Sequence, residues 1–145
     1  MRAVIERVTE ACVTVADKVV GQIGHGLCVF LGVAPSDRET NADHLADKII
    51  RLRVFEDEQG KMNRSVAEVR GELLVVSQFT LYGDTRKGNR PSFSGAASPA
   101  EAQRLYDYFI NRLQASGLKI SSGKFQAKMA VTLTNDGPVT LIIDG

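Results

Sequence analysis

The chain has 145 residues, of which 18 are Lys or Arg and 17 are Asp or Glu. This length supports one domain with a substantial core, and the near-zero net charge gives no argument for a nucleic-acid or membrane partner, which only a local patch would bind. No apolar run approaches the roughly 18 residues of a membrane span. We therefore expect one cytoplasmic domain over residues 1–145, with Cys12 and Cys28 as small buried thiols.

The first part of the chain is predicted to form strands. Short runs rich in Val, Ile and Thr are separated by turn residues, and they span residues 3–8, 12–15, 19–23 and 27–33. Such runs favour an antiparallel meander. His25 lies between two glycines and has no second ligand or base at a suitable spacing, so it is interpreted as a turn residue.

Two helices are predicted from apolar residues at helical spacing. The first opens at Pro35-Ser36-Asp37, and its apolar stripe comprises Ala42, Leu45, Ala46, Ile49 and Ile50. The second begins with a capping box at Ser98–Glu101 and a proline at the first helical position. Its stripe comprises Ala102, Leu105, Tyr106, Phe109, Ile110 and Leu113, and Gly117 is placed to end it.

Between the two helices, residues 73–76 are predicted to form a buried strand that turns polar at its end. Ser77, Gln78 and Thr80 follow the last apolar residue, and Phe79 lies among them. Side chains at the end of a buried strand are held by rigid backbone, which suits a reacting group. Ser and Thr at such a place are also common turn formers, so the segment alone does not decide between the two roles.

A loop over residues 83–93 follows this strand and carries Arg86, Lys87 and Arg90. Its glycines make the backbone permissive, and its positive charge suits a phosphate backbone. An ordinary flexible loop has the same composition. The loop matches neither a Walker A motif nor GxGxxG.

The last third is predicted to return to strands, over residues 118–120, 127–134 and 139–143. The final two flank Asn135-Asp136-Gly137-Pro138, whose composition is typical of a hairpin turn. The order of elements predicts an α+β domain in which two helices cover a largely antiparallel, barrel-like sheet.

The side chains present in the sequence limit the catalytic mechanisms that the protein could use. A hydrolytic triad needs a nucleophile, a base and an orienting acid, yet the only imidazoles, His25 and His44, belong to no such motif. No HExxH motif or carboxylate cluster occurs, so we expect neither a metal nor a cofactor. An enzyme with these residues would depend on backbone N–H groups, uncharged side chains and the substrate, which suits cleavage of an activated ester.

Three segments together resemble D-aminoacyl-tRNA deacylase of the bacterial and eukaryotic type, and the resemblance extends along the whole chain. They are Ser77-Gln78-Phe79-Thr80 with the following Leu81-Tyr82, the loop from Thr85 to Phe93, and Asn135-Asp136-Gly137-Pro138-Val139-Thr140. The resemblance implies hydrolysis of the ester bond of D-aminoacyl-tRNA, and of mischarged glycyl-tRNA, as a proofreading step in translation. It also implies a homodimer with active sites at the subunit interface.

The resemblance assigns roles to individual residues. It implies that Gly137 and Pro138 share a cis bond and reach into the pocket of the partner subunit, where they leave no room for an L side chain. It places the ester near Ser77, Gln78, Phe79 and Thr80, with Met129 lining the pocket. Gln126 departs from the glycine usual in the family. The basic loop residues Arg86, Lys87 and Arg90 are expected to bind tRNA.

The sequence leaves several mechanisms and functions open. Thr80 is either a nucleophile or a positioning group, and the lack of a base beside it favours a route in which a ribose hydroxyl of the tRNA helps to activate water. A backbone N–H at Phe79 or Thr80 would then stabilise the oxyanion. A small-ester esterase using Thr80 or Ser77, and a non-catalytic tRNA-binding module using the basic loop, are the other two classes. The lack of an aromatic stacking platform counts against the module.

Overall fold

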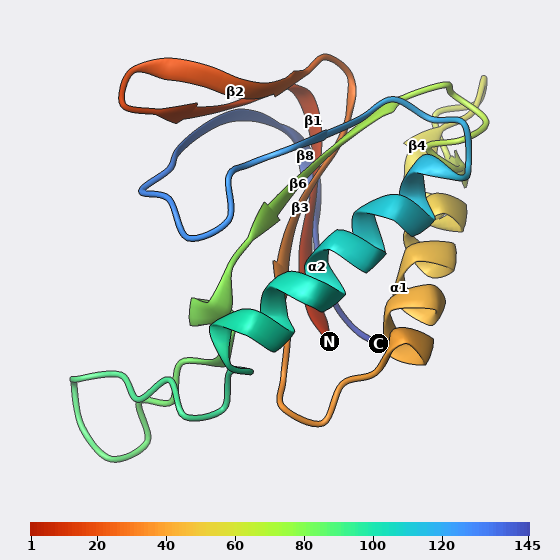
Figure 1. The fold of residues 1–145 in the computed structure, drawn as a ribbon. Coiled ribbons are helices and arrows are strands. Elements are labelled where there is room, and N and C mark those ends of the chain that lie inside the picture. Colours follow the sequence, from red (N-terminus) through yellow and green to blue (C-terminus); the bar gives the residue numbers. More distant parts are fainter.

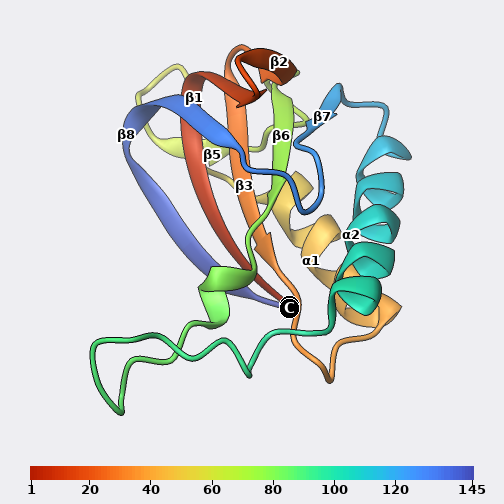
Figure 2. The ribbon, with the colours of Figure 1, turned by 60° about the vertical axis from the view of Figure 1, so that its left-hand side comes forward.

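A computed structural model describes all residues from 1 to 145. One curved six-stranded sheet forms the body of the molecule, and two helices pack against one of its faces (Figure 1, Figure 2). In chain order the elements are β1 (Arg2–Val15), β2 (Lys18–Ile23), β3 (Gly26–Gly32), α1 (Glu39–Arg51), β4 (Phe55–Glu56), β5 (Met62–Arg64), β6 (Glu72–Ser77), the short 3₁₀ helix η1 (Phe79–Tyr82), α2 (Pro99–Gln114), β7 (Ile120–Ser122) and β8 (Ala130–Asp144).

The sheet is mixed, which refines the expected antiparallel arrangement. Its order is β2-β1-β3-β6-β7, with β8 also paired to β1, and β4 and β5 form a separate hairpin. The pairs that β1 makes are antiparallel, whereas β3, β6 and β7 run parallel to one another. Two parallel strands that are neighbours in a sheet need a long crossover connection between them. The connection from β3 to β6 contains α1, and the connection from β6 to β7 contains α2. The predicted α+β class, single domain and two covering helices are confirmed.

The strand β1 joins two of the predicted runs into one. Residues 3–8 and 12–15 were expected as separate strands, but Thr9 and Glu10 continue the same strand with their side chains exposed. Neither residue fixes or reverses the backbone as Gly or Pro does, so nothing in this segment forces a turn. The result is a 14-residue strand that pairs with β3 through its first half and with β2 through its second half.

The central strand β6 is covered on both faces. Leu73 and Val75 belong to the larger core, which lies under the helices, while Leu74 and Val76 belong to a smaller core on the other face of the sheet. This is why the strand is continuously apolar rather than alternating. The apolar stripes of both helices enter the larger core as predicted, with Ala42, Leu45, Ala46 and Ile49 from α1 and Leu105, Tyr106, Phe109 and Leu113 from α2.

The predicted start of the first helix and the predicted cap of the second are both wrong. The first helix begins at Glu39 rather than at Pro35, because Asp37 binds the amino group of Met1 at 2.5 Å and the Ala34 N–H at 2.7 Å instead of capping a helix. The second begins at Pro99 as predicted, but the Ser98 side chain makes no capping hydrogen bond. The expected capping-box partner of Ser98 is Glu101, which pairs instead with Arg104.

The predicted hairpin turn at residues 135–138 is wrong. The whole segment belongs to one strand, β8, which runs antiparallel to β1 from Arg2 opposite Asp144 to Thr14 opposite Ala130. The four residues form a bulge where the register shifts. The Asn135 amide donates to the carbonyls of Arg7 and Val139, both at 3.2 Å, and so supplies hydrogen bonds that the shifted ladder omits.

Two smaller findings complete the fold. Both cysteines are free; Cys28 is buried as expected, but Cys12 is only half-buried. Among the helices, α2 is the longest at 16 residues, and no helix combines the length and apolar character needed to cross a membrane.

Candidate active site

The polar segment after β6 lies at the mouth of a cavity. The chain leaves the sheet at Ser77, and the Gln78 N–H donates to the Leu31 carbonyl at 2.8 Å, which fixes the exit to the end of β3. The helix η1 then begins at Phe79. Two parallel strands therefore hold the segment in place, and it forms a rigid support for a site.

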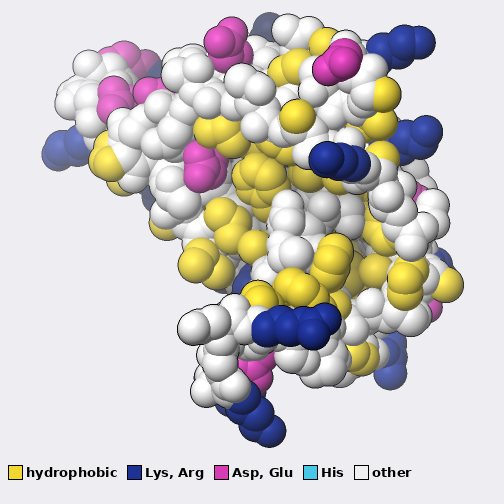
Figure 3. Space-filling view, turned by 90° about the vertical axis from the view of Figure 1, so that its left-hand side faces the viewer, with side chains coloured by type: hydrophobic (Ala, Val, Ile, Leu, Met, Phe, Trp, Pro, Cys, Tyr) yellow, Lys and Arg dark blue, Asp and Glu magenta, His cyan; other side chains and the backbone are white.

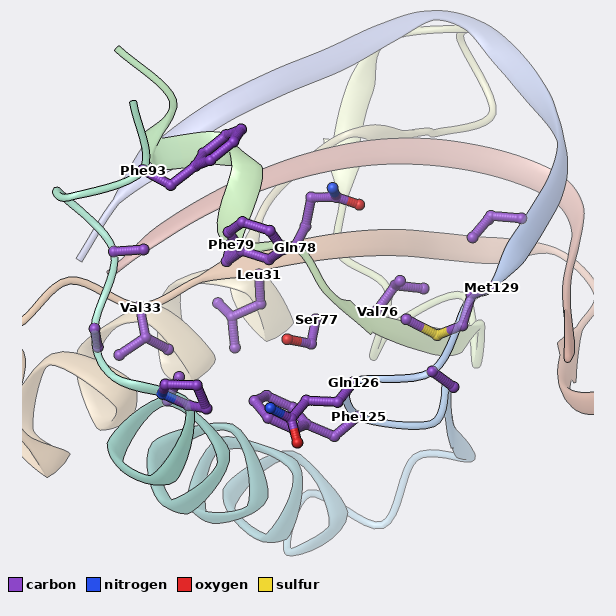
Figure 4. Close-up of a pocket in the computed structure, with 16 residues that line it drawn as sticks. Leu31, Val33, Val76, Ser77, Gln78, Phe79, Phe93, Phe125, Gln126 and Met129 are labelled. Carbon is purple, nitrogen blue, oxygen red and sulfur yellow. The ribbon is translucent and has the colours of Figure 1, made fainter. Parts of the chain in front are cut away.

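The cavity has a volume of about 620 Å³ and lies between the end of the sheet, η1, and the start of α2. Figure 3 shows apolar side chains gathered in a hollow, with Lys and Arg side chains around it, and Figure 4 shows the lining side chains pointing inward. Most of the lining is apolar, and the exceptions are Ser77, Gln78 and Gln126. No Asp, Glu, His, Lys, Arg, Cys or Tyr lines the cavity.

The structure brings several of the predicted site residues together at this cavity. Ser77, Gln78, Phe79 and Met129 all line it. Thr80 does not line it, but its hydroxyl accepts a short hydrogen bond from the Gln78 amide. The Thr80 side chain is thus tied to another uncharged group, and no side chain that lines the cavity is a base for it.

The amide N–H groups of Phe79 and Thr80 lie at the beginning of η1. The first hydrogen bond of this helical turn runs from the Leu81 N–H to the Gln78 carbonyl. In such a turn the amides that precede the first hydrogen bond have no partner within it. Neither group therefore has a backbone partner within the turn, and of the two residues Phe79 lines the cavity.

Gly137 and Pro138 lie elsewhere, on the surface. Both residues are exposed and neither lines the cavity of their own chain. The peptide bond between them is cis. The space beside Gly137 is open, since an added Cβ would meet only the Asn135 Oδ1 atom at 3.4 Å.

The bulge that holds Gly137 and Pro138 is supported by a buried arginine that the sequence analysis missed. The side chain of Arg7 is only 4% exposed, and its Nε donates to the Asp136 carbonyl at 3.1 Å and approaches the Asp136 carboxylate at 3.2 Å. Its other nitrogens donate to the carbonyls of Val54, at 2.6 Å, and Gly137, at 3.5 Å. A signal was present, because Arg7 follows Ala3 and Ile5 at the two-residue period of the buried face of β1.

The turn histidine also faces the bulge. His25 lies between β2 and β3 as predicted, and its Nε2 is 4.0 Å from the Asp136 carboxylate. Its ring stacks edge-on against Phe55, with the ring centroids 5.1 Å apart.

The basic loop lies beside the cavity, but none of its cations lines it. Arg86 folds back onto Asp84 through two nitrogens, and these hydrogen bonds lower the pKa of the Asp84 carboxyl to about 2. The loop is closed by a bridge between Asp84 and Ser92. Lys87 and Arg90 are exposed and make no ion pair, so they are the cations of the loop that remain free for a phosphate.

Two aromatic residues of the site were also missed. Phe93 ends the basic loop and meets Phe79 edge-on, with the centroids 5.1 Å apart. Phe125 lines the cavity close to α2, and its ring lies 5.9 Å from that of Tyr106. Their sequence surroundings are turns rather than periodic elements, so no pattern indicated that they would meet.

Comparisons with known proteins find similar sequences and similar structures along the whole chain. The family model described as D-Tyr-tRNA(Tyr) deacylase matches residues 4–144. The chain is 58% identical over 144 residues to the D-aminoacyl-tRNA deacylase of Desulfotalea psychrophila, which covers 99% of this chain and 97% of the relative. It is 56% identical over 144 residues to that of Thermotoga petrophila, with the same two shares covered.

Two solved structures are similar over nearly their whole length. One, described as a c-Myc DNA unwinding element binding protein, superposes with a TM-score of 0.93 at 43% identity, and covers 100% of this chain and 99% of that one. The other, described as a probable eukaryotic D-amino acid tRNA deacylase, has a TM-score of 0.86 at 18% identity over 99% and 98% of the two chains. The second likeness concerns the fold alone.

Proposed function

The chain belongs to the D-Tyr-tRNA(Tyr) deacylase family, and on that premise we propose that it hydrolyses the ester bond of D-aminoacyl-tRNA, releasing a free D-amino acid and tRNA. Its activity is that of a carboxylic ester hydrolase. The observation that supports this most directly is the apolar cavity at the end of β6, which is lined by uncharged polar groups and by no ionisable side chain. Because charged tRNA is used by ribosomes, the enzyme would act in the cytoplasm as a proofreading step of translation.

The proposed mechanism uses backbone and substrate rather than an ionisable side chain. A water molecule attacks the ester carbonyl, helped by a ribose hydroxyl of the tRNA terminus, and the oxyanion is stabilised by the N–H groups of Phe79 or Thr80. The ester C–O bond then breaks and the ribose oxygen takes the proton. Ser77, Gln78 and Thr80 position the ester. The absence of a base among the lining residues supports this route over a Thr80 nucleophile.

Selection of the D-isomer is proposed to come from a second subunit. Gly137 and Pro138 are exposed and firmly held by Arg7 and Asn135, yet they do not line the cavity of their own chain. A homodimer would bring this bulge to the cavity of the partner subunit. The edge strand β8 supports such an interface, because Leu141 and Ile142 are 36% and 69% exposed on it. Glycine has no side chain to exclude, so glycyl-tRNA is also proposed as a substrate.

The basic loop is proposed to bind the tRNA near its acceptor end. Lys87 and Arg90 are free for phosphate contacts, whereas Arg86 is shared with Asp84. Substituting both free residues by alanine should weaken tRNA binding and reduce the dependence of affinity on salt by about two counterions. A non-catalytic tRNA-binding module would show binding of this kind without ester cleavage.

The decisive experiment is single-turnover deacylation of one tRNA charged with D-tyrosine, L-tyrosine or glycine. We expect rapid hydrolysis of the D-tyrosyl and glycyl esters and retention of the L-tyrosyl ester. Equal rates on D and L substrates would contradict the proposed selection. A simple D-tyrosine ethyl ester serves as the control, since cleavage of it as fast as charged tRNA would indicate a general esterase instead.

A further inference from the structure

Two aromatic rings at the cavity mouth are exposed rather than buried. Phe79 is 55% exposed and Phe93 is 39% exposed, and they are the aromatic residues among the large apolar side chains that lie at the surface. The two rings meet edge-on, and Figure 4 shows them together on the side of the cavity away from Phe125. Apolar surface that stays in water does not contribute to folding, so this pair of rings indicates contact with a ligand.

Phe93 is also held firmly in place. At the base of the basic loop, Ser92 and Asp84 exchange two backbone hydrogen bonds, of 2.8 and 2.9 Å. The Ala96 N–H donates to the Phe93 carbonyl at 3.0 Å. The ring lies against Gly83, where an added Cβ would be only 3.1 Å from it. Phe93 is therefore an exposed ring in a fixed position, which lowers the entropy cost of binding a partner.

The same loop carries positive charge that suits an RNA backbone. Lys87 and Arg90 lie between the two residues that close the loop, and both are exposed. Proteins bind single-stranded nucleic acid with this combination, because aromatic rings stack on bases while cations contact phosphates. An amino-acid side chain as the ligand would explain the exposed ring but not the cations beside it. The occupant favoured by these features is therefore a nucleotide.

We propose that Phe93 stacks on the base of the penultimate nucleotide of the tRNA, the cytidine that precedes the terminal adenosine. This inference rests on the proposed function, in which the ester on the last nucleotide reaches Phe79. The preceding base then lies at the cavity mouth, where the exposed ring is, and the strand continues towards Lys87 and Arg90. Because the acceptor end of tRNA is single-stranded, this base is free to stack on a side chain.

A binding experiment with stable analogues of the tRNA end tests the proposal. One probe is cytidylyl-(3′→5′)-3′-amino-3′-deoxyadenosine that carries D-phenylalanine through an amide bond. The second probe has an abasic ribose in place of the cytidine, so it keeps the phosphate and the aminoacyl group but lacks the base. Calorimetry gives the dissociation constants for the wild type, for Phe93→Leu, which loses the flat ring, and for Phe93→Tyr, which keeps it.

The expected result is a loss of affinity confined to the probe that contains cytosine. The wild type should bind this probe about tenfold more tightly than the abasic probe, the magnitude of one base stacked on one aromatic ring. Phe93→Leu should bind both probes as weakly as the wild type binds the abasic probe. Phe93→Tyr is the matched control and should keep the full difference between the probes.

The inference is overturned if the wild type binds both probes equally, or if Phe93→Leu keeps the preference for cytosine. An equal loss for both probes in Phe93→Leu would also overturn it, because that result indicates contact with the amino acid or a structural role. Deacylation of D-phenylalanyl-tRNA by the wild type separates this test from that of the function. If the wild type cleaves that substrate, any of these results refutes only the role of Phe93; if it does not, the proposed function fails.

Discussion

Replacing Arg7 by methionine should destabilise the protein and impair its proposed site together. The guanidinium lies behind the bulge of β8 and holds it through the carbonyls of Asp136 and Gly137 and through the Asp136 carboxylate. Its 2.6 Å hydrogen bond to the Val54 carbonyl is buried. Methionine retains much of the buried apolar volume of the side chain but donates no hydrogen bond.

The expected loss of stability depends on whether water can replace the guanidinium at each of its hydrogen-bond acceptors. Asp136 is 38% exposed at its side chain and Gly137 is exposed, so water can replace most of what they lose. The Val54 carbonyl is buried and would lose a charge-assisted hydrogen bond, which costs about 2 kcal/mol. The partly buried hydrogen bonds add about 1 kcal/mol, so we expect the free energy of unfolding to fall by about 3 kcal/mol. For a chain of this size, that corresponds to a melting temperature lower by about 9 °C.

The assay compares Arg7→Met with Arg2→Met, a matched control on the same strand. Arg2 pairs with Asp144 on the surface, where side-chain exposures are 40% and 64%, so its replacement should cost less than about 1 kcal/mol. Chemical denaturation gives the two free energies of unfolding, and D-tyrosyl-tRNA deacylation should fall at least about tenfold for Arg7→Met alone. Equal stability and activity of the two variants would refute the role assigned to Arg7.

Three further predictions concern single groups. Thr80→Ala should retain measurable deacylation in a single-turnover assay. Near-complete loss of deacylation in a correctly folded variant would indicate that Thr80 is the nucleophile. Tyr106→Phe removes the 2.8 Å hydrogen bond to the Val75 carbonyl and should lower the unfolding free energy by about 1 kcal/mol in urea titrations. The pKa of Asp84 is lowered by Arg86, so the stabilisation from their contact is present above about pH 4 and is lost as pH falls towards 2. An NMR titration of the Asp84 carboxyl carbon checks this, and a midpoint at the ordinary pKa would contradict it.

The sequence predicted those parts of the fold that depend on local periodicity. The stripe of α2 entered the core as expected, because residues three and four apart share one helix face whatever the helix packs against. The polar end of β6 was found for a similar reason, since a buried strand that stops being apolar must leave the core. Ser77 and Gln78 accordingly line the cavity.

Features that depend on contacts between residues far apart in the sequence could not be predicted from local patterns. The composition of residues 135–138 suits a turn, and only pairing with the full length of β1 makes the segment a bulge within one strand. Asp37 resembles a helix cap until the amino group of Met1 binds it. The parallel pairing of β3, β6 and β7 depends on where the crossovers place the strands, and the short apolar runs themselves carry no information about direction.

In the proposed homodimer, each active site combines the cavity of one subunit with the bulge of its partner. Two variants separate these halves. Phe79→Pro removes a proposed oxyanion donor at a position where a helical turn tolerates proline, and Phe79→Ala, which keeps that N–H, is its control. Gly137→Val adds atoms to the open space beside the bulge, where they would block the cavity of the partner.

The measurement is the D-tyrosyl-tRNA deacylation rate of a mixed dimer, purified through two different tags from cells that express both variants. Each variant alone should be nearly inactive. The mixed dimer contains one site with both substitutions and one with neither, so we expect about half of the wild-type rate per dimer. A mixed dimer as inactive as its parents would contradict a site shared between subunits.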